Sequence, residues 1–140
     1  MSATGIAGLK PAVPFLKIEG DQAWLAGSKC GQCGTVFVGG RETCAKCTAR
    51  DAMKPVKLAD TGKLYNFTVV HRNFPGVKVP FISAIVDLDG GGTLKGNLLD
   101  VEPDPERIKF DMPVKVVYRD AGRKDKEGNS YLAYFFVPAN

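Results

Sequence analysis

Histidine is almost missing from this chain of 140 residues, which contains one, and cysteine is scarce, with four residues. No stretch approaches the roughly twenty apolar residues that a transmembrane helix needs, so no membrane-spanning helix is expected. The first thirty residues also lack the continuous apolar run of a secretory signal peptide. We therefore expect a soluble, cytoplasmic protein whose thiols stay reduced.

Charge of either sign is not in large excess. The net charge is +4, and 44% of the residues are hydrophobic, which predicts an ordinary globular chain of one domain or two small modules. Residues 1–60 contain eight Lys and Arg against five Asp and Glu, whereas residues 61–140 contain eleven against ten. A nucleic-acid-binding surface usually carries a much stronger basic face, so a nucleic-acid partner is disfavoured.

The four cysteines lie in two C-x2-C motifs separated by ten residues. The motifs are Cys30-Gly-Gln-Cys33 and Cys44-Ala-Lys-Cys47. This spacing is typical of a zinc ribbon, in which four thiolates close a tetrahedral shell and leave no position for substrate, so the predicted cofactor is structural Zn2+. Four sulfurs also hold iron in rubredoxin-like sites, which leaves an iron-containing electron carrier as an alternative. Two disulfides are disfavoured because cytosolic thiols stay reduced.

The residues after Thr61-Gly62 follow the two-residue period of β-strands. Strands are predicted over residues 64–70, 81–88, 93–99, 114–118 and 131–137, with one helical turn near 102–107 and a polar connection over 120–130. In the first strand, Tyr65, Phe67 and Val69 are predicted to share one face, with Leu64 on the other. Five strands without a long helix match a partly open barrel of the OB type.

The predicted protein is therefore mainly β, with an N-terminal rubredoxin-like zinc ribbon followed by a five-stranded OB-fold barrel. We expect an N-terminal arm and hairpin over residues 1–23, the ribbon over 24–59 and the barrel over 60–140. Residues 1–13 are small and Gly-rich, as in a mobile tail or an arm that becomes ordered on a partner. The ribbon alone is too small for a core, so a metal ion would supply much of its folding free energy.

Several short segments resemble one protein family, the acyl-CoA-associated accessory proteins that have a rubredoxin-like zinc ribbon followed by an OB fold. These segments are GSKCGQCG (27–34), CAKC (44–47), TGKLYNFTVVHR (61–72), PF (80–81), GNL (96–98) and DMPV (111–114). They occur in the family's order and span about residues 15–137. This chain has Gly39-Gly40 where family members commonly carry prolines.

The resemblance implies a non-catalytic small subunit that pairs with a thiolase-like catalytic subunit and helps form the site for a coenzyme A thioester. Such subunits occur in acyl-CoA thiolases and in retro-aldol acyl-CoA lyases, and we expect a heterotetramer. The residues agree, because committing four cysteines to a metal ion leaves no nucleophile of the kind a thiolase needs. A nucleic-acid-binding ribbon and OB module remains an alternative, because fold alone does not define function.

The candidate residues for CoA-ester binding follow the first barrel strand or lie on the next two. An anionic ligand with an apolar arm needs positive charge and apolar side chains on loops held by rigid strands. For His71, a hydrogen bond in a loop, a place at the subunit interface and acid-base chemistry are all open. Phe81 could instead belong to the core, and the lysines could be solvated. The candidates are His71, Arg72, Phe74, Lys78, Phe81, Lys95 and Asn97.

Overall fold

The structure is a computed structural model that describes residues 9–139, and these residues fold almost entirely into β-strands. The elements are β1 (Lys10–Pro11), β2 (Leu16–Glu19), β3 (Gln22–Cys30), β4 (Val36–Val38), β5 (Met53–Lys57), β6 (Thr61–Val70), β7 (Phe81–Leu88), β8 (Thr93–Leu98), the 3-10 helix η2 (Pro105–Arg107), β9 (Pro113–Lys124) and β10 (Ser130–Pro138). The mainly β fold predicted from the sequence is confirmed. Residues 1–8 of the predicted N-terminal arm lie outside the described residues.

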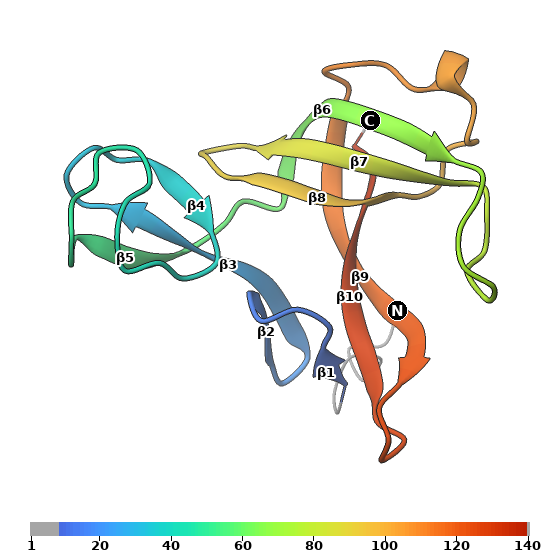
Figure 1. Ribbon diagram of the computed structural model, residues 1–140, viewed down its shortest axis with the longest axis horizontal. Coiled ribbons are helices and arrows are strands. Elements are labelled where there is room, and N and C mark those ends of the chain that lie inside the picture. Colours follow the sequence, from blue (N-terminus) through green and yellow to red (C-terminus); the bar gives the residue numbers. More distant parts are fainter. Residues whose placement is uncertain (1–8, 140) are drawn as a thin grey trace.

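Strands β6 to β10 form a closed barrel of the OB type (Figure 1). The order around the barrel is β6-β7-β8-β10-β9, and β9 pairs back with β6 through Gly62 and Val114. The β8–β10 pair is parallel, at Leu98 and Phe136, whereas the other barrel pairs are antiparallel. Because every barrel strand has two neighbours, no barrel edge is left open along the paired stretch. The helical turn predicted near residues 102–107 is present as η2.

The prediction for the faces of the first barrel strand is wrong in part. Leu64 is fully buried, and the ladder between β6 and β7 then contains a bulge between Leu64 and Asn66. A bulge inserts one unpaired residue, which shifts the inward-facing positions by one. Phe67 and Val69 therefore pack on the same core as Leu64, and Tyr65 points outward with 62% of its surface exposed.

The predicted polar connection over residues 120–130 is also wrong in part, because β9 continues to Lys124 and the connection spans residues 125–129. Beyond the barrel, β9 and β10 form a long two-stranded ribbon, with Asp120 opposite Leu132 and Lys124 opposite Ser130 (Figure 1). The β9 side chains of this ribbon are largely solvent-exposed, so their polarity is compatible with a strand. The short strand β1 adds to this ribbon, parallel to β10.

Strand β3 connects the N-terminal hairpin to the cysteine-bearing ribbon. It pairs with β2 over Gln22–Leu25 and with β4 and β5 over Ala26–Cys30. One face of β3 is buried: Leu25 is 1% exposed, and a Cβ on Gly27 would come within 2.5 Å of a Leu58 methyl carbon. The proposed boundary between residues 23 and 24 thus lies inside one continuous strand.

The hairpin, the ribbon and the barrel share one hydrophobic cluster. Leu16, Leu25 and Leu58 belong to the same buried cluster as barrel residues such as Val86 and Phe136. On the ribbon side, Val36 and Val38 of β4 pack against this cluster. The ribbon is therefore held on the barrel by apolar burial as well as by the chain connection. Within residues 9–139, no helix is long and apolar enough to cross a membrane.

Candidate functional site

The two C-x2-C motifs form two turns of closely similar geometry at the end of the ribbon. In the first, the Cys30 N–H donates to the Thr35 carbonyl and the Gly34 N–H donates to the Cys30 carbonyl, each at 2.9 Å. In the second, the Cys44 N–H donates to the Ala49 carbonyl at 3.0 Å, and the Thr48 N–H donates to the Cys44 carbonyl at 2.9 Å. Each turn also directs a backbone N–H to the first sulfur, from Gln32 to Cys30 and from Lys46 to Cys44, at 3.4 Å.

These turns bring all four cysteine sulfurs into one cluster. The Sγ atoms lie within 4.8 Å of one another, and the Cys30–Cys47 and Cys33–Cys44 sulfurs are each 3.6 Å apart. A tetrahedral ion with metal–sulfur bonds of about 2.3 Å requires sulfurs about 3.8 Å apart. The four cysteines therefore fit a tetrahedral thiolate site. Cys30 and Cys44 are buried, whereas Cys33 and Cys47 face solvent.

The pKa values of Cys33 and Cys47 are shifted in opposite directions. A hydrogen bond between Cys33 and the Thr35 hydroxyl lowers the pKa of Cys33 to about 6. For Cys47, the Ala49 backbone hydrogen bond lowers the pKa, but burial and the other three sulfurs outweigh it and raise the pKa to about 11. Without a cation, the cluster thus holds both an acidic thiol and a protonated one. A divalent cation stabilises all four as thiolates.

Most of the candidate residues for CoA-ester binding lie at one end of the β6–β7 hairpin. His71, Arg72, Phe74 and Lys78 belong to the connection 71–80, in which every residue is exposed. Phe74 is the most exposed large hydrophobic side chain, at 82%. The ion pairs found within residues 9–139 include neither Arg72 nor Lys78. Both cations are therefore available to an anionic ligand.

The structure brings three of the candidates together in one hollow. Lys78, Phe81 and Asn97 line a hollow of about 330 Å3 beside Leu99 and Pro103. Asn97 on β8 lies opposite Ser83 on β7, and Phe81 is two residues from Ser83, so Phe81 and Asn97 share the outward face of the barrel. Phe81 is accordingly half-buried and outside the buried core.

The remaining candidates do not line that hollow. Lys95 lies two residues before Asn97 on the same face of β8, with an exposed side chain, and its carbonyl accepts a hydrogen bond from the Tyr134 hydroxyl. His71, Arg72 and Phe74 remain in the loop beyond the hollow's lining. The role of all seven residues in ligand binding stays a prediction.

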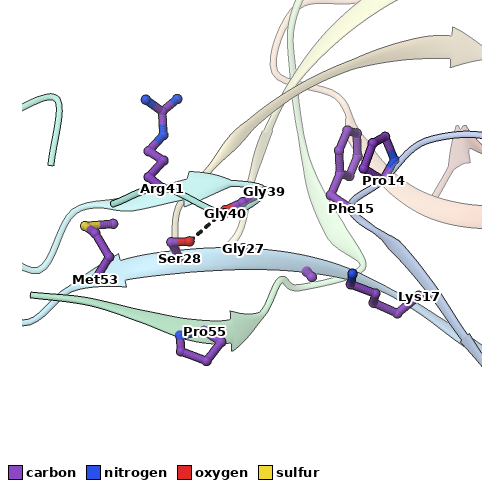
Figure 2. Close-up of a pocket in the computed structure, with 11 residues that line it drawn as sticks. Pro14, Phe15, Lys17, Gly27, Ser28, Gly39, Gly40, Arg41, Met53 and Pro55 are labelled. Atoms are coloured by element: carbon purple, nitrogen blue, oxygen red, sulfur yellow. Dashed lines mark hydrogen bonds between the residues drawn. The ribbon is translucent and has the colours of Figure 1, made fainter. Parts of the chain in front are cut away.

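A larger hollow, of about 500 Å3, lies over the outer face of β3 and was not predicted from the sequence (Figure 2). Its lining includes Phe15, Ser28, Arg41 and Met53, which come from four separate segments of the chain. The Ser28 hydroxyl donates to the Gly39 carbonyl at 2.7 Å and so ties β3 to the segment after β4 (Figure 2). Small side chains at alternate positions of β3 were the available signal, because they leave space on one face.

The fold and the cysteine cluster together define a class of protein: a four-cysteine ribbon joined to an OB barrel. Comparison with known proteins places the chain within that class. It belongs to the family of DUF35 domain-containing scaffold proteins, since it is 32% identical to such a protein of Methanocaldococcus jannaschii over 117 residues, 81% of each chain. Residues 55–119 match the family model for the C-terminal OB-fold domain of ChsH2.

Two further relatives come from enzyme complexes. A solved structure, described as the Ltp2-ChsH2(DUF35) aldolase, is similar with a TM-score of 0.66 and 28% identity, covering 84% of this chain and 86% of that one. A probable enoyl-CoA hydratase alpha subunit of Thermomonospora curvata is 31% identical over 101 residues. That match covers 71% of this chain but 31% of the relative. The family predicted from the sequence is thus confirmed.

Proposed function

We propose that the chain is a non-catalytic accessory subunit of an acyl-CoA enzyme complex whose catalytic subunit has a thiolase fold. The observation that carries this proposal is that all four cysteines converge on one cluster. A thiolase requires an activated cysteine beside a base. The one histidine, His71, lies at the end of β6 in the barrel, whereas the cysteines lie in the ribbon. The partner would therefore supply the nucleophile.

The relatives support the assignment of catalysis to a partner subunit. Relatives are named as scaffold proteins and as a hydratase alpha subunit, and the similar solved structure is described as an aldolase. Two reactions are consistent with a thiolase-fold partner: thiolytic cleavage of a 3-oxoacyl-CoA, and retro-aldol cleavage of an acyl-CoA. The aldolase description favours the second reaction, and the absence of a cysteine nucleophile on this chain is compatible with both.

We propose further that the cluster of Cys30, Cys33, Cys44 and Cys47 holds one structural Zn2+. Four thiolates fill a tetrahedral shell, so such an ion would stabilise the ribbon and would have no open position for catalysis. At the barrel end, the proposed CoA-ester surface consists of the exposed loop 71–80 and the hollow lined by Lys78, Phe81 and Asn97. There Arg72 or Lys78 would pair with phosphate, and Phe74 or Phe81 would contact the pantetheine arm or acyl chain.

A nucleic-acid-binding role is less well supported by the barrel. Aromatic residues of an OB fold can stack on bases when their faces are exposed. Here Phe136 is fully buried, and the Tyr134 ring packs between Phe15 and Phe136, with centroids 5.7 and 6.1 Å away. The Phe136 ring is therefore in the core, and the Tyr134 ring is partly buried against it.

Reconstitution tests the proposed function. The chain is purified alone and together with a thiolase-fold subunit encoded beside its gene, and both samples are assayed with a 3-oxoacyl-CoA plus CoA and with a 3-hydroxyacyl-CoA. We expect turnover only in the presence of both subunits, and a heterotetramer by light scattering. Turnover by the isolated chain, or no complex with the thiolase-fold subunit, would contradict the proposal.

A further inference from the structure

The outer face of β3 forms the floor of a trough. Trp24, Ala26 and Ser28 alternate along the strand and so share the face opposite Leu25 and Gly27. Cross-strand partners face the same side of a sheet, and Ser28 lies opposite both Phe37 on β4 and Pro55 on β5. The floor is thus low at Ala26 and Ser28, which are small, with the Trp24 ring at one end and the Phe37 ring beside Ser28 at the other.

Two adjoining hollows lie over this face of β3. The hollow in Figure 2, of about 500 Å3, shares Lys17, Ala26 and Pro55 with a second hollow of about 510 Å3 that reaches Trp24. From Trp24 to Ser28 the strand advances about 13 Å, at about 3.3 Å per residue. Together they form an elongated open trough rather than a compact cavity.

The wall at the centre of the trough is made of backbone. Ala26 donates its N–H to the Phe15 carbonyl at 2.7 Å and accepts from the Gly39 N–H at 3.0 Å, so β2 and β4 meet along one edge of β3 at this residue. Gly40 follows with open space where a Cβ would lie. Within residues 9–139, no backbone-to-backbone hydrogen bond uses Gly40 or Arg41. These backbone groups are accessible to a bound chain.

Three cations border the trough. Arg41 lies over the Phe37 ring, 4.3 Å from its centroid, and Lys57 lies over the Trp24 ring at 4.5 Å. Lys17 lies opposite Trp24 in the β2–β3 ladder. Glu19 is the single carboxylate among the residues that line the two hollows. None of the three cations belongs to an ion pair found within residues 9–139, and with Glu19 as the single carboxylate the trough carries a net positive charge.

We propose that this trough binds an extended segment of the catalytic subunit that alternates acidic and apolar side chains. This inference rests on the proposed function, because it names the surface through which the accessory subunit holds its partner. Small floor residues between two aromatic rings accept apolar side chains, and the three cations attract carboxylates. Lys17 and Lys57 lie at the Trp24 end of the trough and Arg41 lies at the Ser28 end, and this separation favours an extended polypeptide over a single nucleotide phosphate group.

Charge reversal in the assembled complex tests the proposal. The dissociation constant for the catalytic subunit is measured with the wild-type chain, with Lys17→Glu/Arg41→Glu and with the matched barrel control Lys63→Glu/Lys115→Glu. Measurements at about 50 mM and about 300 mM NaCl separate screened charge effects from apolar ones. The four substituted residues are all exposed, so both double variants are expected to fold; these residues are Lys17, Arg41, Lys63 and Lys115. We expect at least about tenfold weaker binding for the trough variant at low salt, a smaller salt dependence, and little change for the control.

A second variant, Ala26→Leu, fills the trough without changing its charge. It is expected to weaken binding while the salt dependence persists. Hydrogen exchange of the complex should newly protect the Gly40 and Arg41 amides, which make no backbone-to-backbone hydrogen bond within residues 9–139, together with an acidic segment of the catalytic subunit. Equal dissociation constants for the wild-type chain and both trough variants, in a complex that retains turnover, would overturn this inference alone. Displacement of the partner by adenosine 3′,5′-bisphosphate from an intact trough would also overturn it, in favour of a nucleotide site. Failure of the wild-type chain to bind any thiolase-fold subunit would overturn both this inference and the proposed function.

Discussion

Gly91, in the turn between β7 and β8, lies directly against Val36 of the cysteine-bearing ribbon: a Cβ built on Gly91 would come within 2.7 Å of the Val36 Cβ. Carbon atoms in protein interiors do not pack that closely, so a larger residue would push the ribbon away from the barrel. Gly91 also has a φ of +118°, a conformation that side chains with a Cβ rarely adopt. The junction of ribbon and barrel therefore depends on glycine at this position.

Gly91→Ala should lower the free energy of unfolding by about 2 to 4 kcal/mol, from backbone strain and overpacking together. The matched control is Gly90→Ala, where φ is also positive, at +82°, but no atom lies within 4 Å of the added Cβ. The control should lose about 1 kcal/mol, from strain alone. Urea denaturation measures both values. Equal losses in the two variants would show that the contact with Val36 does not constrain the junction.

Thr48→Gly should stabilise the protein by about 1 kcal/mol. Thr48 occupies the position in the second cysteine turn that Gly34 occupies in the first, with φ values of +64° and +79°. A β-branched residue in the left-handed region is strained by about 1 to 2 kcal/mol, whereas glycine is not. Denaturation of the metal-loaded protein measures the change, and Thr48→Ala serves as the control that keeps a Cβ. A loss of stability in Thr48→Gly would mean that the hydroxyl bond to the Cys47 carbonyl outweighs the strain.

Cys44→Ser should remove the bound metal and leave protein that is insoluble or does not assemble. Cys44 is 1% exposed and its sulfur lies 3.6 Å from that of Cys33, so the loss of one thiolate opens the shell at its buried side. The control is Ala45→Ser, an exposed neighbour that adds the same hydroxyl without removing a ligand. Elemental analysis should find one zinc per wild-type chain and a colourless sample. A full zinc equivalent in Cys44→Ser would rule out the four-cysteine site, and visible absorption with bound iron would favour the electron carrier.

At least one of the variants Arg72→Ala and Lys78→Ala should weaken binding of the CoA ester to the reconstituted complex by about 1 to 3 kcal/mol, the usual contribution of a charge-assisted hydrogen bond to phosphate. Steady-state kinetics should show this loss mainly in KM. The control is Lys63→Ala, an exposed lysine on β6 that lies outside the loop 71–80. If both variants keep the wild-type KM and kcat, the loop does not contact the ligand and the subunit acts only as a scaffold.

Asp125→Asn should destabilise the protein near neutral pH but not in acid. The Lys10 ammonium, whose nitrogen lies 2.6 Å from the carboxylate, holds the pKa of Asp125 well below its usual range, and backbone N–H groups of Asn129 and Glu127 add to the effect. Because the folded-state pKa lies below the unfolded value of about 3.9, the stabilisation is present above about pH 4 and is lost as the pH falls further.

Urea midpoints at about pH 7 and pH 2.5 measure this effect. The difference between wild type and Asp125→Asn should shrink at the lower pH. Asp120→Asn is the control, because Asp120 accepts a backbone N–H from Gly122 but belongs to neither of the ion pairs found within residues 9–139. A difference that persists unchanged at about pH 2.5 would assign the stabilisation to the backbone hydrogen bonds and not to the charge.

The features of the fold that depend on residues close together in the sequence were predictable. The C-x2-C spacing predicted the cluster of Cys30, Cys33, Cys44 and Cys47, and the two-residue period predicted all five barrel strands. The errors fall where tertiary pairing overrides local pattern. The bulge after Leu64 changes which residues face the core, and pairing with β10 keeps Asp120 and Lys124 in a strand despite their polarity.

The amino-acid sequence by itself determined the cluster of four cysteines and the β character of the chain, because turn geometry and side-chain alternation act over a few residues. Only the tertiary structure decided which strands close the barrel and that a trough lies over the outer face of β3. The parallel pairing of Leu98 with Phe136 and the trough bordered by Lys17, Arg41 and Lys57 join residues far apart in the chain. Such contacts form because burial of one shared core brings the elements together, and no local pattern encodes them.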